Sequence, residues 1–209
     1  MAAFPTVAVL AGSELAAVLR AWQGLGYNRR AKFLHDAAKY IVAHGEPQTI
    51  DELVKLPGVG INTAGAIINY VYQIPTAFIE TNIRTVYFQH FFDGNSQVTD
   101  GMLLKIVAET IDHQSPREWF WALMDYGAEL KSQGQGRLDT SKHYKKQPPL
   151  KGSIREVRGQ IVKQLSQGKQ LHVDLESIVG GDERFEPALN GLMADGLIAQ
   201  SGNFIHLTS

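Results

Sequence analysis

Cysteine is absent from the 209 residues of this chain. Its absence excludes disulfides, thiolate zinc sites and cysteine-ligated iron–sulfur clusters. No apolar run approaches the roughly 20 residues that a membrane span needs. The N-terminus also lacks the basic segment followed by an apolar core that is typical of a secretion signal. We therefore expect a cytoplasmic protein that makes no contact with a membrane.

The chain also lacks an excess of charge of either sign, because 20 Lys and Arg oppose 21 Asp and Glu. This balance neither favours nor excludes a nucleic-acid partner, since the location of the basic residues matters more than their total. Residues 131–163 are locally basic and contain Asp139 and Glu156 as their only acids. This basic stretch predicts a surface that faces phosphates, with a solvated linker of biased charge as the alternative.

The first 130 or so residues have the apolar spacing of helices and no period-two alternation, which predicts a helical domain with a buried core. A composition of 44% hydrophobic and 20% charged residues supports that core. The expected helices cover residues 13–22, 29–44, 62–72, 82–92, 100–112 and 116–130, with a short helix between Thr49 and Leu56.

Beyond this region the pattern changes twice. Residues 132–152 are rich in Gly, Gln, Lys and Pro and predict a basic linker or arm. Helices are then expected over residues 154–165, 173–179 and 185–194, followed by strands over 197–199 and 204–207. Three helices closed by a hairpin indicate a small winged-helix-like domain over residues 153–209. The alternative is a helical tail with two edge strands.

Leu56-Pro57-Gly58-Val59-Gly60 lies between two predicted helices, the second of which opens at Asn62 and Thr63. Glycines permit a tight turn, and the first amides of the second helix then lack partners and suit a phosphate oxygen. The motif predicts a sequence-independent contact with DNA. A turn that only packs two helices is the alternative. The residues expected at this contact are Leu56, Gly58, Val59, Gly60, Asn62 and Thr63.

Several segments occur together in the order and spacing of the A/G-mismatch adenine glycosylases. They are Phe4-Pro5-Thr6-Val7, Leu25-Gly26-Tyr27, Arg30-Ala31-Lys32-Phe33-Leu34, the turn at 56–60, Thr63-Ala64-Gly65-Ala66-Ile67 and Met124-Asp125-Tyr126-Gly127-Ala128. From Phe4 to about Lys131 the chain resembles this branch of the helix-hairpin-helix base-excision glycosylases; endonuclease III matches less well. The resemblance implies a mainly α fold for residues 1–131, with duplex DNA containing a mismatched or damaged base as partner, the target base flipped out, and a monomer.

The resemblance also implies a catalytic carboxylate. The family places an aspartate at the start of the helix after the hairpin, where this chain has Glu80, with Asn82 beside it as a hydrogen-bonding helper. An anion there stabilises the positive charge that develops on the sugar as the N-glycosidic bond breaks. The additional methylene makes Glu80 either an adapted substitute or a sign of lost activity. An acidic residue that only favours a helix N-terminus is the alternative reading.

Two further departures concern the chemistry. Asn62 occupies the position of the lysine with which bifunctional members form a Schiff base, so base removal without strand cleavage is expected. Family members also have, ahead of the segment that matches Phe4, a helix with the glutamate that protonates the adenine, and this chain starts after that helix. We expect the loss of a general acid to cost about 10² to 10⁴-fold in rate, with a misplaced start as the preferred explanation over a fragment or a non-cutting DNA-binding protein.

The arm after Gly127 replaces the cluster-bearing cysteines of other members, and Lys142, His143 and Lys145 in it are expected to contact DNA. Tyr27 resembles a DNA-contacting loop residue of the family, with buried packing as the alternative. The seven histidines show no metal-ligand spacing, so we expect neither a metal nor any other cofactor.

These observations favour a DNA-repair N-glycosylase associated with the nucleoid that removes adenine opposite guanine or 8-oxoguanine and has no lyase activity. One alternative keeps the scaffold and removes another base, such as uracil or thymine. The other is a non-catalytic DNA-binding protein that uses the hairpin and the winged helix.

Overall fold

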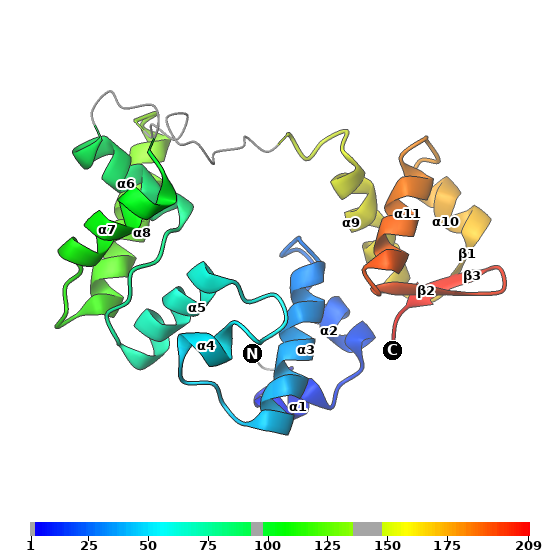
Figure 1. The fold of residues 1–209 in the computed structure, drawn as a ribbon. Helices are drawn as coiled ribbons and strands as arrows, with labels where there is room; N and C mark the ends of the chain where they lie inside the picture. The colour runs from blue at the N-terminus through cyan, green and yellow to red at the C-terminus, as the bar shows by residue number, and fades with distance from the viewer. Residues whose placement is uncertain (1–2, 93–97, 136–147) are drawn as a thin grey trace. The chain divides into compact units, whose positions relative to one another are not determined.

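The structure is a computed structural model that describes residues 3–92, 98–135 and 148–209. The chain forms two compact units (Figure 1). The terminal unit joins residues 1–46, 56–58 and 147–209, and the central unit contains residues 47–55 and 59–146. Both units combine segments that are separate in sequence. The division expected from the sequence, into residues 1–131, 132–152 and 153–209, differs from these units and stays a prediction about domains.

The described residues confirm the mainly helical architecture. The terminal unit contains α1 Val7–Ala11, α2 Leu15–Ala21, α3 Arg29–His44, α9 Ile154–Leu165, β1 Gln170–Leu171, α10 His172–Ile178, α11 Phe185–Ala194, β2 Ile198–Ser201 and β3 Phe204–Leu207. The central unit contains α4 Ile50–Leu53, α5 Ile61–Ile67, the π-helix η1 Ile68–Tyr72, α6 Thr81–Phe91, α7 Asp100–Thr110 and α8 Pro116–Ser132.

The sequence-based expectations differ from this set at a few places. Helix α1 and strand β1 were not predicted, and α4 ends at Leu53 rather than at Leu56. The helix expected over residues 62–72 widens into a π-helix at Ile68. There the buried side chain of Asn69 donates to the carbonyls of Gly65 at 2.8 Å and Thr76 at 2.7 Å, which holds the widened turn against the following loop.

The C-terminal part of the terminal unit is a winged helix. Its elements run α9-β1-α10-α11-β2-β3, and the strands form an antiparallel sheet in the order β1-β3-β2. Strand β3 pairs on both sides, with Gln170 opposite Ile205 and Ile198 opposite Leu207. The alternative of a tail with two edge strands is therefore wrong, because β1 supplies a third strand.

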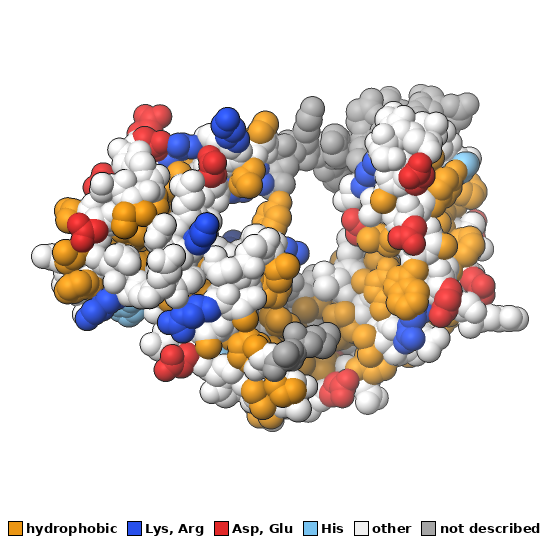
Figure 2. All heavy atoms as spheres, turned by 180° about the vertical axis from the view of Figure 1, so that it is seen from behind, with side chains coloured by type: hydrophobic (Ala, Val, Ile, Leu, Met, Phe, Trp, Pro, Cys, Tyr) orange, Lys and Arg blue, Asp and Glu red, His pale blue; other side chains and the backbone are white. Residues whose placement is uncertain are grey.

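Each unit has its own hydrophobic core. In the terminal unit α2 shares one cluster with the winged helix, so that Leu19 is fully buried together with Ile161, Leu192 and Ile205. The central core contains α6, α7 and α8 and includes an aromatic contact in which the rings of Phe78 and Phe120 lie 4.4 Å apart. On the face that Figure 2 shows, acidic and basic side chains are interspersed, in keeping with the net charge of -1.

Candidate active site

The helix-hairpin-helix turn leaves the start of α5 without a side-chain cap. Helix α4 has a complete capping box, in which Thr49 and Glu52 each accept from the other's backbone N–H. Helix α5 instead begins after Gly60, whose backbone is extended and which offers no side-chain oxygen. The first amides of α5 are therefore available to an acceptor from outside the protein, as expected for a phosphate contact.

The two glycines of the turn have different structural roles. Gly58 has a φ of +76°, and a Cβ at that position would overlap the ring of Phe33. Gly60 has a φ of -92° and open space where a Cβ would lie. Glycine at 58 is therefore required by the fold, whereas glycine at 60 keeps the surface before α5 open.

The other residues predicted to contact DNA at the hairpin differ in how far their side chains are exposed. Asn62 and Thr63 are exposed and Val59 is half-buried. The side chain of Leu56 is only 6% exposed, so it packs in the core and contact with DNA through that side chain is excluded. The hairpin thus presents its backbone and the start of α5, with Leu56 as an anchor.

Asn62 connects the start of α5 to the segment that leads into α6. Its amide oxygen accepts a hydrogen bond from the N–H of Ile79 at 3.1 Å. Ile79 directly precedes Glu80, so the residue in the lysine position helps to hold the backbone beside the predicted carboxylate.

Glu80 is the N-cap of α6. Its backbone is extended, and its carboxylate oxygen Oε2 accepts a hydrogen bond from the N–H of Asn82 at 2.6 Å. The expected helix-terminal role of Glu80 is therefore present in the structure. This role is compatible with chemistry, because the capping bond fixes the orientation of a half-buried carboxylate and leaves its second oxygen without a partner among the described residues.

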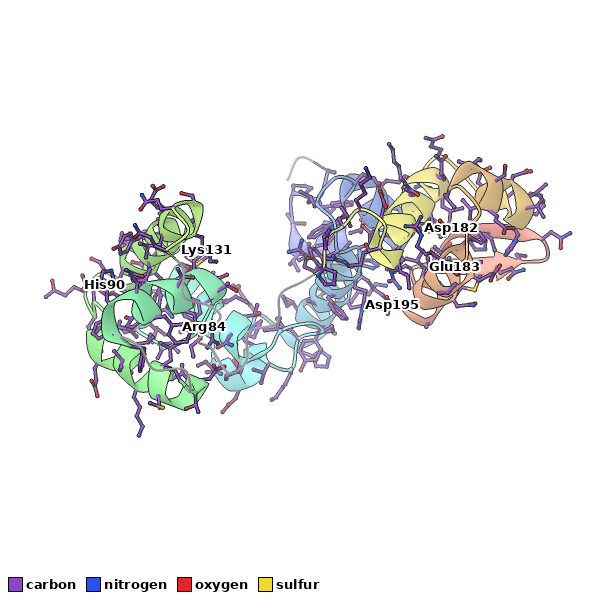
Figure 3. All side chains as sticks on the ribbon, turned by 90° about the horizontal axis from the view of Figure 1, so that it is seen from above. Arg84, His90, Lys131, Asp182, Glu183 and Asp195 are labelled. Atoms are coloured by element: carbon purple, nitrogen blue, oxygen red, sulfur yellow. The ribbon has the colours of Figure 1, made fainter. Side chains whose placement is uncertain are left out.

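Lys131 lies at the C-terminal end of α8 (Figure 3), and its side chain reaches the first turn of α6. Its amine donates to the side-chain oxygen of Asn82. Burial lowers the pKa of Lys131, and the negative charge of Glu80 acts in the opposite direction. The sequence placed Lys131 only at the start of the basic stretch, since no local pattern reveals a contact with a residue 49 positions earlier.

Gly127 makes this arrangement sterically feasible. A Cβ at Gly127 would overlap the backbone of Asn82, so the absence of a side chain lets α8 approach the first turn of α6. Met124, one turn earlier, has its sulfur 4.0 Å from the side-chain nitrogen of Asn82. Met124 and Gly127 of this segment therefore support the start of α6.

Tyr70 is a further neighbour of Glu80 that the sequence reasoning missed. Burial raises the pKa of the Tyr70 hydroxyl, and the negative charge of Glu80 raises it further. Its ring lies 6.3 Å from that of Trp121 and 6.1 Å from that of Phe78, centre to centre. Tyr70 thus connects the carboxylate to a group of aromatic rings.

The remaining predicted contacts are Tyr27 and three residues of the basic arm. Tyr27 belongs to the terminal unit, where it has a φ of +51° and a side chain that is 58% exposed, which excludes the alternative of buried packing. Lys142, His143 and Lys145 lie outside the described residues.

Within the parts of the chain that the structure describes, no group of three or more His, Asp or Glu side chains could hold a metal ion. The same residues contain no helix with the length and hydropathy needed to cross a membrane.

The helix-hairpin-helix motif matches residues 43–70 of the chain. The adenine DNA glycosylase of Buchnera aphidicola subsp. Baizongia pistaciae is 30% identical over 129 residues, which cover 60% of this chain and 37% of that protein. The adenine DNA glycosylase of Mycolicibacterium smegmatis is 42% identical over 86 residues, or 40% of this chain and 29% of that protein. The human adenine DNA glycosylase is 30% identical over 135 residues, which cover 61% of this chain and 25% of that protein.

The chain thus spans less than two fifths of the length of each of these relatives. The matching segments include the hairpin, and all three relatives carry the same name although they come from bacteria and a eukaryote. On these grounds the chain contains a helix-hairpin-helix motif and is similar to adenine DNA glycosylases.

Proposed function

We propose that the protein is a DNA-repair glycosylase that hydrolyses the N-glycosidic bond of adenine opposite guanine or 8-oxoguanine in duplex DNA, acting as a monomer. The observation that carries the proposal is the carboxylate of Glu80, fixed at the N-terminus of α6 by the N–H of Asn82 at 2.6 Å. The names of the relatives support adenine as the base removed.

The arrangement around Glu80 suits a reaction in which positive charge develops on the sugar. An oriented anion stabilises that charge without reorganising during the reaction. Asn82 links the carboxylate to Lys131, since its backbone N–H bonds Glu80 and its side-chain oxygen accepts from the lysine amine. We assign Glu80 as the catalytic carboxylate and Asn82 as the residue that holds it in place.

The hairpin supplies the DNA grip in this proposal. The uncapped start of α5 and the open surface at Gly60 give phosphate oxygens access to backbone amides. Contacts to phosphates carry no base code, so they position the duplex for any sequence. Selection of the mismatched base then falls to the site around Glu80.

Replacing Gly60 with alanine should weaken duplex binding about 10-fold or more for all sequences alike. The new Cβ has open space in the free protein, so the fold tolerates it, but it occupies the surface that a phosphate approaches. Fluorescence anisotropy with two unrelated duplexes at several salt concentrations measures the effect. Wild-type binding should fall steeply as salt rises. A loss confined to one duplex would instead indicate base readout, and salt-independent binding would remove the phosphate contact.

The protein should release a free base and leave the abasic strand uncut until alkali is added. Asn62 cannot form a Schiff base, and the amine of Lys131 is engaged with Asn82. Borohydride added during the reaction should therefore trap no covalent adduct. A trapped adduct would contradict the monofunctional assignment, and its loss in Lys131→Ala but not in Lys55→Ala would identify the amine.

A further inference from the structure

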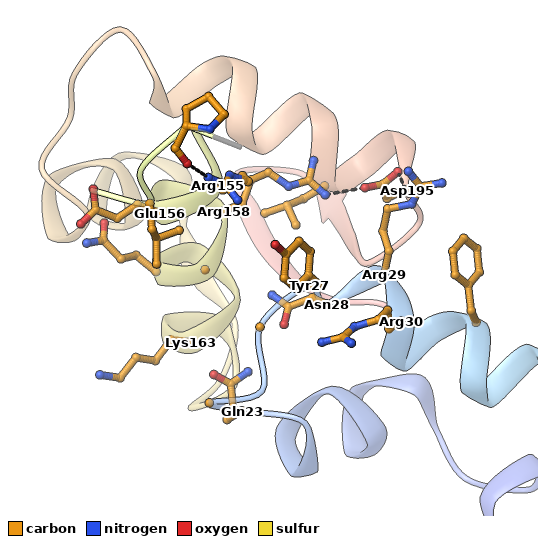
Figure 4. Close-up of a pocket in the computed structure, with 18 residues that line it drawn as sticks. Gln23, Tyr27, Asn28, Arg29, Arg30, Arg155, Glu156, Arg158, Lys163 and Asp195 are labelled. Atoms are coloured by element: carbon orange, nitrogen blue, oxygen red, sulfur yellow. Dashed lines mark hydrogen bonds and ion pairs between the residues drawn. The ribbon is translucent and has the colours of Figure 1, made fainter. Parts of the chain in front are cut away.

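Several cationic side chains of this protein fasten one element to another. In the terminal unit, Asp195 at the end of α11 binds Arg29 at 3.3 Å and also binds Arg158, which ties the start of α3 to the winged helix (Figure 4). These contacts involve none of the residues assigned to base removal. Lys131 makes a contact of the same kind in the central unit, and its partner belongs to the site of base removal.

Lys131 lies on the face of α8 that meets the first turn of α6. Met124, Gly127 and Lys131 follow one another at intervals of three and four residues, which places them on one side of the helix. The Met124 sulfur lies 4.0 Å from the Asn82 side-chain nitrogen, and a Cβ at Gly127 would overlap the Asn82 backbone. The Lys131 amine donates to the Asn82 side-chain oxygen. One face of α8 therefore holds both the backbone and the side chain of Asn82.

The chemistry of the lysine amine fixes which way the Asn82 amide faces. An ammonium group has three donors and no acceptor, so only the oxygen end of an amide can pair with it. The nitrogen end of Asn82 then faces the Met124 sulfur, which is a weak acceptor. A reversed amide would bring its own N–H donors against the ammonium and would leave the lysine unsatisfied. Lys131 thus holds Asn82 in a single orientation.

The same contact keeps the cation near Glu80 without pairing the two directly. Burial lowers the pKa of Lys131 and the negative charge of Glu80 raises it, so the two groups lie within range of each other's charge. Across the described residues, no hydrogen bond or ion pair joins them. Asn82 stands between them instead, with its side chain on the lysine and its backbone N–H on Oε2 of Glu80 at 2.6 Å. The carboxylate is therefore oriented without being neutralised by a direct ion pair.

We propose that Lys131 is a positioning residue for base removal, which anchors the Asn82 side chain and thereby steadies the N–H that orients the Glu80 carboxylate. A hydrogen bond from a charged donor is stronger than a neutral one, so Lys131 restrains Asn82 more than a neutral donor would. The inference rests on the proposed function, because it assigns Lys131 to the same site. A phosphate contact by Lys131, as the first residue of the basic stretch, is the competing role and predicts different results.

The first test compares Lys131→Met with the wild type in single-turnover release of adenine from a duplex with adenine opposite 8-oxoguanine. Methionine is also unbranched and flexible, so it fills similar space without the amine. The rate at saturating protein should fall roughly 10- to 150-fold, the value of one hydrogen bond to a charged group. Affinity for the duplex and its dependence on salt should not change. Lys131→Arg, which keeps a cation that only donates, should recover most of the rate.

Lys105→Met is the matched control, because Lys105 is an exposed lysine on α7 of the same unit. It makes the same change of charge and shape away from Asn82, so the rate should equal that of the wild type. An unchanged rate in Lys131→Met would overturn the inference. So would a weaker affinity, with a salt slope reduced by about 0.9 and an unchanged rate at saturation, since that is the result of losing one phosphate contact on a duplex.

A double variant tests whether Lys131 acts through Asn82. In Asn82→Ala the lysine has already lost its acceptor, so adding Lys131→Met should lower the rate by less than about 2-fold more. Losses that multiply in the double variant would show that the two residues act independently, and would overturn the inference.

Nuclear magnetic resonance tests the contact whether or not a base is released. The short bond to Glu80 should move the Asn82 backbone amide proton downfield, and Glu80→Ala gives its position without that bond. Lys131→Met should move the resonance toward this reference position, and Lys105→Met should leave it in place. An unmoved resonance in Lys131→Met would overturn the role of Lys131. A moved resonance in a protein that releases no adenine would instead count against the proposed function alone.

Discussion

Glu80→Gln is expected to lower the rate of adenine release by about 10² to 10³-fold or more while leaving affinity for DNA nearly unchanged. Loss of one electrostatic stabiliser of a transition state typically has an effect of that size. The carboxylate acts on charge that develops only as the bond breaks, so binding of the intact substrate should not change. The prediction is checked by the single-turnover rate of adenine release from a duplex with adenine opposite 8-oxoguanine, measured with the full-length protein.

The structure makes glutamine a clean substitution at this position. A glutamine side chain retains an oxygen that can accept from the N–H of Asn82, so the cap of α6 is kept and only the charge is removed. Thermal unfolding should therefore be close to that of the wild type. Full activity in Glu80→Gln would remove Glu80 from the mechanism. Glu80→Asp then asks whether the site is adapted to the longer side chain, because aspartate is a good cap but draws the carboxylate back.

Gly127→Ala is expected to impair both stability and catalysis. The added Cβ would overlap the backbone of Asn82, so α8 and the start of α6 must separate. Overpacking of this kind costs about 1–3 kcal/mol, which the better helix propensity of alanine, about 1 kcal/mol, offsets only in part. A displacement of Glu80 near 1 Å can cost on the order of 100-fold in rate.

The matched control for this prediction is Gly101→Ala on α7 of the same unit. A Cβ there meets no atom closer than 4.0 Å, so alanine should leave the rate unchanged and stabilise the helix slightly. Denaturant unfolding and single-turnover rates of both variants give the comparison. Wild-type stability and rate in Gly127→Ala would show that α8 does not support the site.

The sequence by itself determined most of the helices and the hairpin. Apolar spacing predicted α3 at its observed bounds, 29–44, as well as α9 and α11, because a helix that buries one face repeats its apolar residues at short range. Segment order indicated the similarity to adenine glycosylases, and the catalytic role of Glu80 stays a prediction from its position after the hairpin. Each of these rests on residues that are close together along the chain.

Only the tertiary structure decided which distant residues meet. It brought Lys131 to Asn82 across 49 positions, joined α2 to the winged helix in one core, and placed Arg29 against Asp195. It also buried Leu56 and exposed Tyr27. Such contacts depend on how whole helices pack, and a packing partner leaves no periodic signal in the sequence of either element. The physical reason is that burial and ion pairing are properties of surfaces that exist only after the helices have assembled.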